Sequence, residues 1–374
     1  MRKKLLKTPL LLPVFLVVLC LFSLKLYADP LRFIAYGDTR RNSDTVDKPQ
    51  TKHNAIAKVI RELNPDFVLF SGDMVYNNEF EKFLTVVINN YAGDKRIPLY
   101  PVIGNHEVIV SEKWGGVEAL IKARSRYVLF EAFKGRLDDS YSSYLNTIFD
   151  RMKPKQSWYS FVKQTNGVEL QFIELNSSLP DDEDQFKWFL NELKRVDGPK
   201  VVLAHYPPYS IGLHGNESAL HGSSREARFR NRYTKVFNDP RNNVAMVVGG
   251  HDHNYQRTCK TDEKGGVRTP VYIVSGGGGA DLTGGGEGNV SQILTEGFQC
   301  QGLVTAYHFV EVTATADSSR NVTIKCRAMG LRYDLSKGLP DDTTFEAQFV
   351  KERLELIDDF TVTWQGKHVI GNEF

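Results

Sequence analysis

Five short polar stretches of this sequence carry side chains of the kinds that bind metal ions. They are Gly37-Asp38, Gly72-Asp73, Gly104-Asn105-His106, Ala204-His205 and Gly250-His251-Asp252-His253. Their carboxylate, amide and imidazole groups form an oxygen and nitrogen donor set that suits two cations such as Fe, Mn or Zn. Asp73 has two carboxylate oxygens and can bridge both ions. The residue types therefore indicate a metal centre, and a metal centre can activate water for hydrolysis.

Each stretch has a simpler explanation when it is taken alone. A Gly-Asp pair after a strand is usually a turn, and a single histidine near a strand end is more often a packed or capping residue than a ligand. Five such stretches in succession, with carboxylate, amide and imidazole groups at their tips, are much harder to explain as turns. We therefore interpret them together as one predicted site.

A short apolar run rich in β-branched residues precedes each polar stretch, as is typical of a buried strand. The runs cover residues 31–36, 65–70, 97–103, 200–204 and 242–248. Between the first two, residues 53–63 place apolar side chains at helical spacing, which gives a βαβ rhythm. Functional residues of open α/β sheets gather at the carboxyl ends of the strands. We therefore expect the five polar tips to meet at one edge.

Arg40 stands two residues after Asp38, where a histidine often binds the same metal ion. Arginine cannot coordinate a cation, so the ion held by Asp38 needs another donor. Tyr76, three residues after Asp73, is the nearest candidate. Its phenolate is a hard anionic donor that favours a trivalent ion, which would select Fe(III) over Zn. The alternative is that Tyr76 is an aromatic side chain packed beside the turn.

The polar stretches, read with their neighbours, resemble a known family. "GDTR", "GDMVY", "GNHE", "AHYPP" and "GGHDHNYQR" are similar to the five metal motifs of calcineurin-like metallophosphoesterases. Tyr76 and the segments "HYPPYSIGLHG" and "HNYQRT" make the chain most similar to purple, tartrate-resistant type, acid phosphatases. The resemblance spans about residues 31 to 330 and departs from the purple enzymes at Arg40, where they usually carry glycine.

The resemblance implies both a fold and a ligand set. The fold is an α/β sandwich of two mixed β-sheets with flanking helices, in four layers, with its last strands near 307–314, 321–328 and 356–364. One ion takes Asp38, Asp73, Tyr76 and His253. The other takes Asp73, Asn105, His205 and His251. The metal pair is iron together with iron, zinc or manganese.

Three further residues receive catalytic roles from the same resemblance. His106 points at the substrate, and His214 falls where these enzymes carry a histidine that can donate a proton. A histidine in a surface loop is the alternative for His214. Arg40 would hold a phosphate oxygen with two parallel hydrogen bonds, and a surface arginine paired with a nearby acid is the alternative.

The expected function is that of an exported acid phosphatase, which hydrolyses small phosphomonoesters by attack of a hydroxide generated at the metal centre. One alternative is a phosphodiesterase or nucleotide hydrolase on the same centre. Another is a non-catalytic binding protein on this scaffold, although none of the metal positions has been lost. The residues after Asp73, "MVYNN", differ from the Asp-Arg-Gly of protein Ser/Thr phosphatases.

Composition and charge limit the partners. The chain has 374 residues, with 47 basic against 45 acidic side chains, so no strong field recruits nucleic acid or acidic lipid. Four basic residues within the first seven precede an apolar run that ends before Ala28, a pattern typical of a signal peptide. Leu26 is large for a cleavage signal. Residues 1–28 are therefore expected to be either a cleaved signal or an uncleaved anchor, with the domain at 29–374 periplasmic or secreted.

The remaining segments carry weaker expectations. Residues 110–157 are interpreted as a helical insertion beside the active site or as plain packing. The glycine cluster at 276–288 lacks the Lys-Ser/Thr of a phosphate-binding P-loop, so it is predicted to be a loop. Outside the signal, Cys259, Cys300 and Cys326 would allow one disulfide and one free thiol.

Overall fold

The computed structural model describes residues 30–41, 50–74, 91, 97–107, 157–215, 224–260, 270–285, 297–366 and 368–372. The N-terminal segment at 1–28, Tyr76 and nearly all of the insertion predicted at 110–157 lie outside these ranges. No helix within the described ranges is long and apolar enough to cross a membrane.

The first of two mixed sheets contains the strands that lead to Asp38, Asp73 and Asn105. Its order is β14-β13-β12-β11-β1-β2-β3, with β1, β2 and β3 parallel and the other neighbours antiparallel. The strands are β1 (Leu31–Tyr36), β2 (Phe67–Phe70), β3 (Leu99–Pro101), β11 (Ala306–Ala316), β12 (Val322–Arg332), β13 (Glu355–Gln365) and β14 (His368–Asn372).

The second sheet contains the strands that lead to His205 and His251. Its order is β10-β8-β9-β7-β6-β5-β4, with a parallel centre of β5, β6, β7 and β9. The strands are β4 (Tyr159–Thr165), β5 (Val168–Leu175), β6 (Lys200–Ala204), β7 (Val244–Gly249), β8 (Tyr255–Lys260), β9 (Val271–Ser275) and β10 (Phe298–Val304).

Aromatic side chains fill the space between the two sheets. Phe33 of β1 and Phe67 of β2 meet Phe172 of β5 with ring centroids 5.3 and 5.2 Å apart. Because side chains alternate along a strand, Tyr36 of β1 lies on the opposite face and stacks on His53. The sheets therefore share one dry core, and each has an outer face that needs a separate cover.

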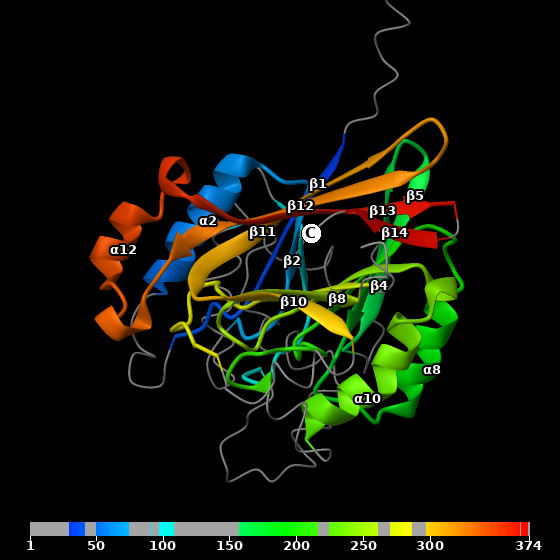
Figure 1. Cartoon of the computed structure of the whole chain (residues 1–374), viewed down its shortest axis with the longest axis horizontal. Coiled ribbons are helices and arrows are strands. Elements are labelled where there is room, and N and C mark those ends of the chain that lie inside the picture. The colour runs from blue at the N-terminus through cyan, green and yellow to red at the C-terminus, as the bar shows by residue number, and fades with distance from the viewer. Residues whose placement is uncertain are drawn as a thin grey trace, which may run out of the picture.

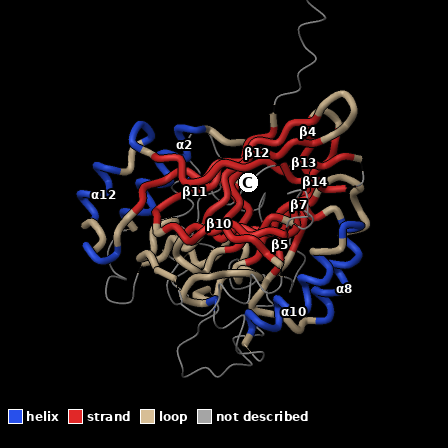
Figure 2. Tube along the Cα trace, viewed as in Figure 1, coloured by secondary structure: helices blue, strands red, loops and turns tan. Residues whose placement is uncertain are grey.

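Helices cover the two outer faces. The helices are α2 (Thr51–Leu63), α8 (Glu183–Glu192), α10 (Arg225–Phe237) and α12 (Asp342–Gln348), with 3-10 turns at Pro240–Asn242, Leu335–Lys337 and Lys351–Arg353. Helices α2 and α12 lie on the side of the first sheet, and α8 and α10 pack on β5, β6 and β7 of the second (Figures 1 and 2). Asp182, Ser224 and Asp341 cap α8, α10 and α12 by accepting a backbone N–H. The predicted sandwich of two mixed sheets with flanking helices is confirmed.

The predicted strands are found close to their expected positions, including the three near the C-terminus. One expectation changes: the five polar tips do not follow one sheet. Three follow β1, β2 and β3 of the first sheet, and two follow β6 and β7 of the second. The site is therefore built across the sandwich. Cys259 and Cys326 are both buried free thiols, so they do not form the disulfide considered above.

Candidate metal centre

Three of the predicted ligands leave their strands through an unusual backbone conformation. Asp38, Asp73 and His251 have φ angles of 59°, 51° and 71°, in the left-handed region that residues with a Cβ rarely occupy. Each follows a glycine at the end of a buried strand. Such conformations cost free energy and gather at functional sites. The same unusual conformation at three strand ends therefore supports the prediction of a functional site there.

Two glycines bring the carboxylates against neighbouring backbone. A Cβ added at Gly250 would lie 2.2 Å from Asp38 Oδ2, and one added at Gly104 would lie 2.2 Å from Asp73 Oδ1. No side chain fits at either position without displacing a carboxylate. The Gly in "GNHE" and in "GGHDH" is thus explained by close approach rather than by turn geometry alone.

His205 presents a lone pair to two oxygen acceptors. Its Nδ1 lies 2.8 Å from the backbone carbonyl of Ser71. A carbonyl only accepts hydrogen bonds, so Nδ1 carries the ring hydrogen and Nε2 of the neutral ring keeps its lone pair. That Nε2 lies 2.8 Å from Asn105 Oδ1 and 3.4 Å from Asp73 Oδ1. Three acceptors, those of His205 and Asp73 buried and that of Asn105 half-buried, face one another, an arrangement that a cation between them would stabilise.

His251 completes this group. Its Nε2 is buried and makes no hydrogen bond within the part of the chain that the structure describes. Ligand atoms of Asp73, His205 and His251 all lie within 4.8 Å of one another. A buried imidazole nitrogen that lacks a hydrogen bond to any described residue and lies close to other ligand atoms fits a metal site better than a packed core, where buried polar atoms are normally satisfied.

Asp38 and His253 lie beside the group, on its other side. His253 Nε2 is 3.6 Å from Asp38 Oδ1, while its Nδ1 donates to the backbone carbonyl of Asp281 at 2.7 Å. Both Asp38 oxygens accept the backbone N–H of His251, at 3.1 and 2.9 Å. This pair also presents a carboxylate and an imidazole lone pair. The fourth predicted ligand here, Tyr76, lies outside the described residues.

Arg40 points into the site rather than outward. Its Nε lies 3.3 Å from Asp73 Oδ2, its Nη2 lies 3.5 Å from His253 Nε2, and its side chain is only 13% exposed. Its acidic partner is thus a buried predicted ligand and not a surface carboxylate.

The two other catalytic candidates flank the cluster. His106 Nε2 lies 3.8 Å from Asp73 Oδ2, and the backbone N–H of His106 donates to Asp73 Oδ1 at 2.9 Å. His214 is half-buried, and its ring centroid lies 4.2 Å from that of His251. Both histidines are therefore within reach of a substrate held at the cluster.

Two buried carboxylates organise the loops and were not singled out from the sequence. Glu107 accepts the backbone N–H of Asp73, Met74 and Gly104 at 3.0, 2.7 and 2.7 Å, which ties two polar tips together. Asp252 accepts the backbone N–H of His214 at 2.9 Å. Both residues lie inside motifs quoted above, "GNHE" and "GGHDH". Those motifs were the signal in the sequence that could have identified them. Their role is to hold backbone amides, which no residue pattern reveals.

Burial keeps the histidines of the site neutral. It lowers the pKa of His205, places that of His251 well below the ordinary value, and lowers that of His253 to about 3. Neutral imidazole is the form that binds metal ions. These side chains are therefore ready for a cation even in mildly acidic solution.

The two carboxylates behave in opposite ways. Burial, and then the charge of Asp73, raise the pKa of Asp38 well above its ordinary value. Burial also opposes ionisation of Asp73, but His205, His106 and Arg40 outweigh it and lower the pKa of Asp73 to about 2. The charged form of Asp38 is therefore unfavourable in the metal-free fold.

Replacing Asp38 by asparagine should therefore stabilise the metal-free protein at neutral pH, on the order of 1 kcal/mol. A raised folded-state pKa contributes stability below the unfolded pKa that is lost as pH rises through the folded value. The stability difference between Asp38→Asn and the wild type should accordingly grow with pH. Urea denaturation of both metal-free proteins from about pH 4 to about pH 9 measures it. A stability difference that is independent of pH would show that the folded protein does not disfavour ionised Asp38.

The sequence profile of the calcineurin-like phosphoesterases matches residues 31–255, a range that contains every predicted ligand. The chain belongs to the calcineurin-like phosphoesterases. This phosphoesterase matches no curated protein by sequence.

Solved structures with the same fold are distant in sequence. The purple acid phosphatase PPD1 from yellow lupin (Lupinus luteus) seeds aligns with a TM-score of 0.58 and 19% identity, over 89% of this chain and 54% of the lupin chain. A structure of PhoD aligns with a TM-score of 0.52 and 15% identity, over 93% of this chain and 72% of that one. This phosphoesterase thus spans about half the length of the lupin enzyme, and the likeness concerns the fold.

Proposed function

We propose that this protein is a two-metal phosphoesterase acting as an acid phosphatase on small phosphomonoesters. One ion is assigned to Asp73, Asn105, His205 and His251, and the other to Asp38, Asp73, Tyr76 and His253, with iron paired with iron, zinc or manganese. The observation that carries the proposal is the meeting of acceptor atoms around Asp73. His205 Nε2 lies 2.8 Å from Asn105 Oδ1 and 3.4 Å from Asp73 Oδ1. Membership of the phosphoesterase family supplies the reaction type.

When bound, two such ions polarise phosphoryl oxygens and lower the pKa of water to about 7. The protein's own groups orient the ester around them. Arg40 offers a planar fork of donors for phosphate oxygens, and His106 or His214 can protonate the departing alkoxide. Burial lowers the pKa of His106 to about 4, so this histidine carries a transferable proton mainly in acidic solution.

The substrate class is tested by comparing an aryl phosphate monoester with the matching diester. The acid phosphatase proposal expects kcat/KM at least about tenfold higher on the monoester. A preference for the diester would move the assignment to a phosphodiesterase or nucleotide hydrolase on the same centre. Absence of both activities in metal-loaded protein would favour the non-catalytic binding alternative.

Tyr76 is expected to colour the protein. A phenolate on Fe(III) absorbs visible light by charge transfer, so iron-loaded, oxidised protein should be pink to purple. Tyr76→Phe should bleach it and weaken retention of the trivalent ion. Visible spectra of both proteins, at equal iron content by metal analysis, measure the effect. A colourless iron-bound wild type would assign Tyr76 to packing and the chain to another branch of the family.

Export is part of the proposal and rests on residues 1–28. A fusion of residues 1–40 to a reporter that is active only after export tests it, and a reporter confined to the cytoplasm would overturn it.

A further inference from the structure

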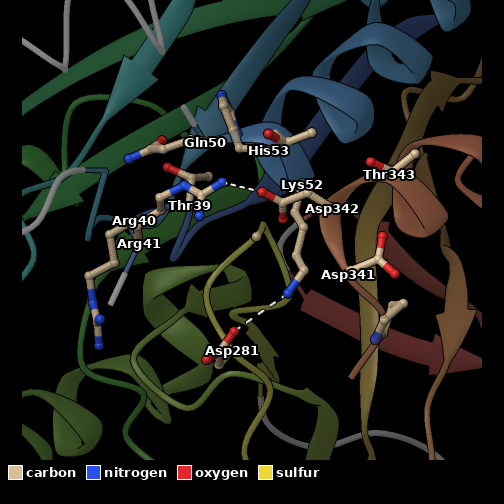
Figure 3. A pocket seen from close by; sticks show the side chains of 13 residues that line it. Thr39, Arg40, Arg41, Gln50, Lys52, His53, Asp281, Asp341, Asp342 and Thr343 are labelled. Carbon is tan, nitrogen blue, oxygen red and sulfur yellow. Dashed lines mark hydrogen bonds and ion pairs between the residues drawn. The ribbon is translucent and has the colours of Figure 1, made fainter. Parts of the chain in front are cut away.

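A pocket adjoins the metal centre on the side of His253. It has a volume of about 470 Å³, within the usual range of small-molecule sites, and residues at the starts of α2 and α12 contribute to its wall (Figure 3). Arg40 belongs to the wall and contacts Asp73 Oδ2 at 3.3 Å. Asp281, also in the wall, accepts a hydrogen bond from His253 Nδ1 at 2.7 Å through its backbone carbonyl. An ester whose phosphate lies against Arg40 can therefore extend its alcohol part into this pocket.

The wall of the pocket is almost wholly polar. In the described part of the chain it contains no Leu, Ile, Val, Met, Phe, Tyr or Trp. The imidazole ring of His53 lies in the wall, but it already stacks on Tyr36, with ring centroids 6.0 Å apart. An aryl group, an alkyl chain or a nucleobase would therefore find little apolar surface to cover, and burial of apolar surface is what stabilises such groups in a pocket.

The charges of the wall are balanced. The basic side chains are Arg40, Arg41 and Lys52, and the acidic ones are Asp281, Asp341 and Asp342. Arg41 pairs with Asp342, and Lys52 Nζ lies 3.5 Å from Asp281 Oδ1 (Figure 3). A wall with equal numbers of both signs favours neither a second anionic group nor a cation. It suits a neutral guest that can both donate and accept hydrogen bonds.

Gln50 presents a buried acceptor at this wall. The residue is 4% exposed, and its Nε2 donates to the backbone carbonyl of Met74 at 3.3 Å. Its Oε1 is buried and has no hydrogen-bond partner among the described residues, although buried polar atoms are normally paired. Lys52, whose side chain is 13% exposed, brings an ammonium group with three donor hydrogens to the same wall. A hydroxyl group in the pocket could donate to the first and accept from the second.

We propose that this pocket binds the alcohol part of the substrate and that this part is a polyol or a sugar. Its hydroxyl groups donate to Gln50 Oε1 and accept from Lys52 Nζ, while Arg40 stays with the phosphate. Hydrolysis breaks the bond between phosphorus and the alcohol oxygen, that oxygen gains a proton, and the products are the free polyol and inorganic phosphate. This inference rests on the proposed phosphatase function and adds the substrate class.

Two matched esters test the pocket. A sorbitol phosphate esterified at a primary hydroxyl and n-hexyl phosphate are both primary alkyl monoesters of six carbons, and only the first carries further hydroxyl groups. The wild type should show kcat/KM at least about tenfold higher on the sorbitol ester, because the hexyl chain leaves polar groups of the wall unpaired. Equilibrium dialysis of metal-free protein against each ester should show the same preference in affinity without turnover.

Substitutions in the wall should reduce that preference. Lys52→Met removes the ammonium donor and should lower the ratio of the two kcat/KM values at least about fivefold. Gln50→Met removes the buried acceptor and should lower the ratio as well, so the test does not depend on the folding of one variant. Lys325→Met is the matched control, because Lys325 of β12 also pairs with an aspartate, Asp359, at 3.5 Å but does not line the pocket. It should keep the ratio of the wild type.

The outcomes separate the pocket from the proposed function. Equal kcat/KM on both esters, or a ratio that Lys52→Met and Gln50→Met leave unchanged, would overturn the pocket while phosphatase activity stands. An equal fall of the ratio in Lys325→Met would show a general charge effect and would also overturn it. Absence of hydrolysis in metal-loaded protein, with a binding preference for the sorbitol ester that Lys52→Met removes, would overturn the phosphatase proposal and support the pocket.

Discussion

Replacement of Asp73 by asparagine should lower kcat/KM on an aryl phosphate by at least about a thousandfold. Loss of a single group that stabilises charge in the transition state already lowers kcat by about 10²–10³-fold. Asp73 lies between the two halves of the site. His205 approaches its Oδ1 at 3.4 Å, whereas Arg40 approaches its Oδ2 at 3.3 Å. Asparagine keeps the shape but provides a single neutral acceptor, so it can no longer serve both ions. Steady-state kinetics of metal-loaded protein measures the loss.

The matched control for this substitution is Asp359→Asn. Asp359 is a 37% exposed residue of β13 that pairs with Lys325 at 3.5 Å, remote from the polar tips. Its replacement should leave the rate within about twofold of the wild type, as for most surface changes. Unchanged activity in Asp73→Asn, with the same metal content, would exclude a shared carboxylate and with it the two-metal proposal.

Replacement of His205 by alanine should remove one ion and lower the rate by at least about a hundredfold. Loss of a residue that only supports a metal ligand already lowers metal affinity or activity by about 10–100-fold, and His205 is itself a predicted ligand. His205 is fully buried and turns Nε2 toward Asn105 and Asp73. Metal analysis of dialysed protein measures the ion content.

His308→Ala controls for the cavity that alanine leaves in place of a buried histidine. His308 is also fully buried, but its Nδ1 contacts the carbonyl of Ala306 and its Nε2 contacts Ser275, away from the ligand cluster. Loss of packing should be similar in both variants, whereas loss of an ion should occur only in His205→Ala. Retention of two ions by His205→Ala would mean that the ligand assignment is wrong.

The sequence by itself determined the strands and the donors. The apolar runs at 31–36, 200–204 and 242–248 became strands because a continuous run of β-branched side chains is stable only when it is buried on both faces. A polar residue directly after such a run must lie at the sheet's edge. Short-range patterns were therefore enough to predict that these strands exist and which side chains follow them.

Tertiary structure decided how those ends combine. The tips divide between two sheets, and the sequence pattern of a strand does not state which sheet it joins. The inward direction of Arg40 likewise depends on Asp73 and His253, residues that the chain brings to it from 33 and 213 positions away. The sequence could exclude Arg40 as a ligand but could not show that its side chain lies against two of the predicted ligands.

The supporting contacts of the site also became visible only in three dimensions. Glu107 holds the backbone amides of Asp73 and Met74, and His205 keeps its Nε2 lone pair because Nδ1 donates to the carbonyl of Ser71. Backbone amides and carbonyls are the same in every residue, so no residue pattern marks which of them a side chain will meet. The sequence thus determined the chemical groups of the centre, whereas long-range backbone contacts decided their orientation, their protonation and the place of Arg40 among them.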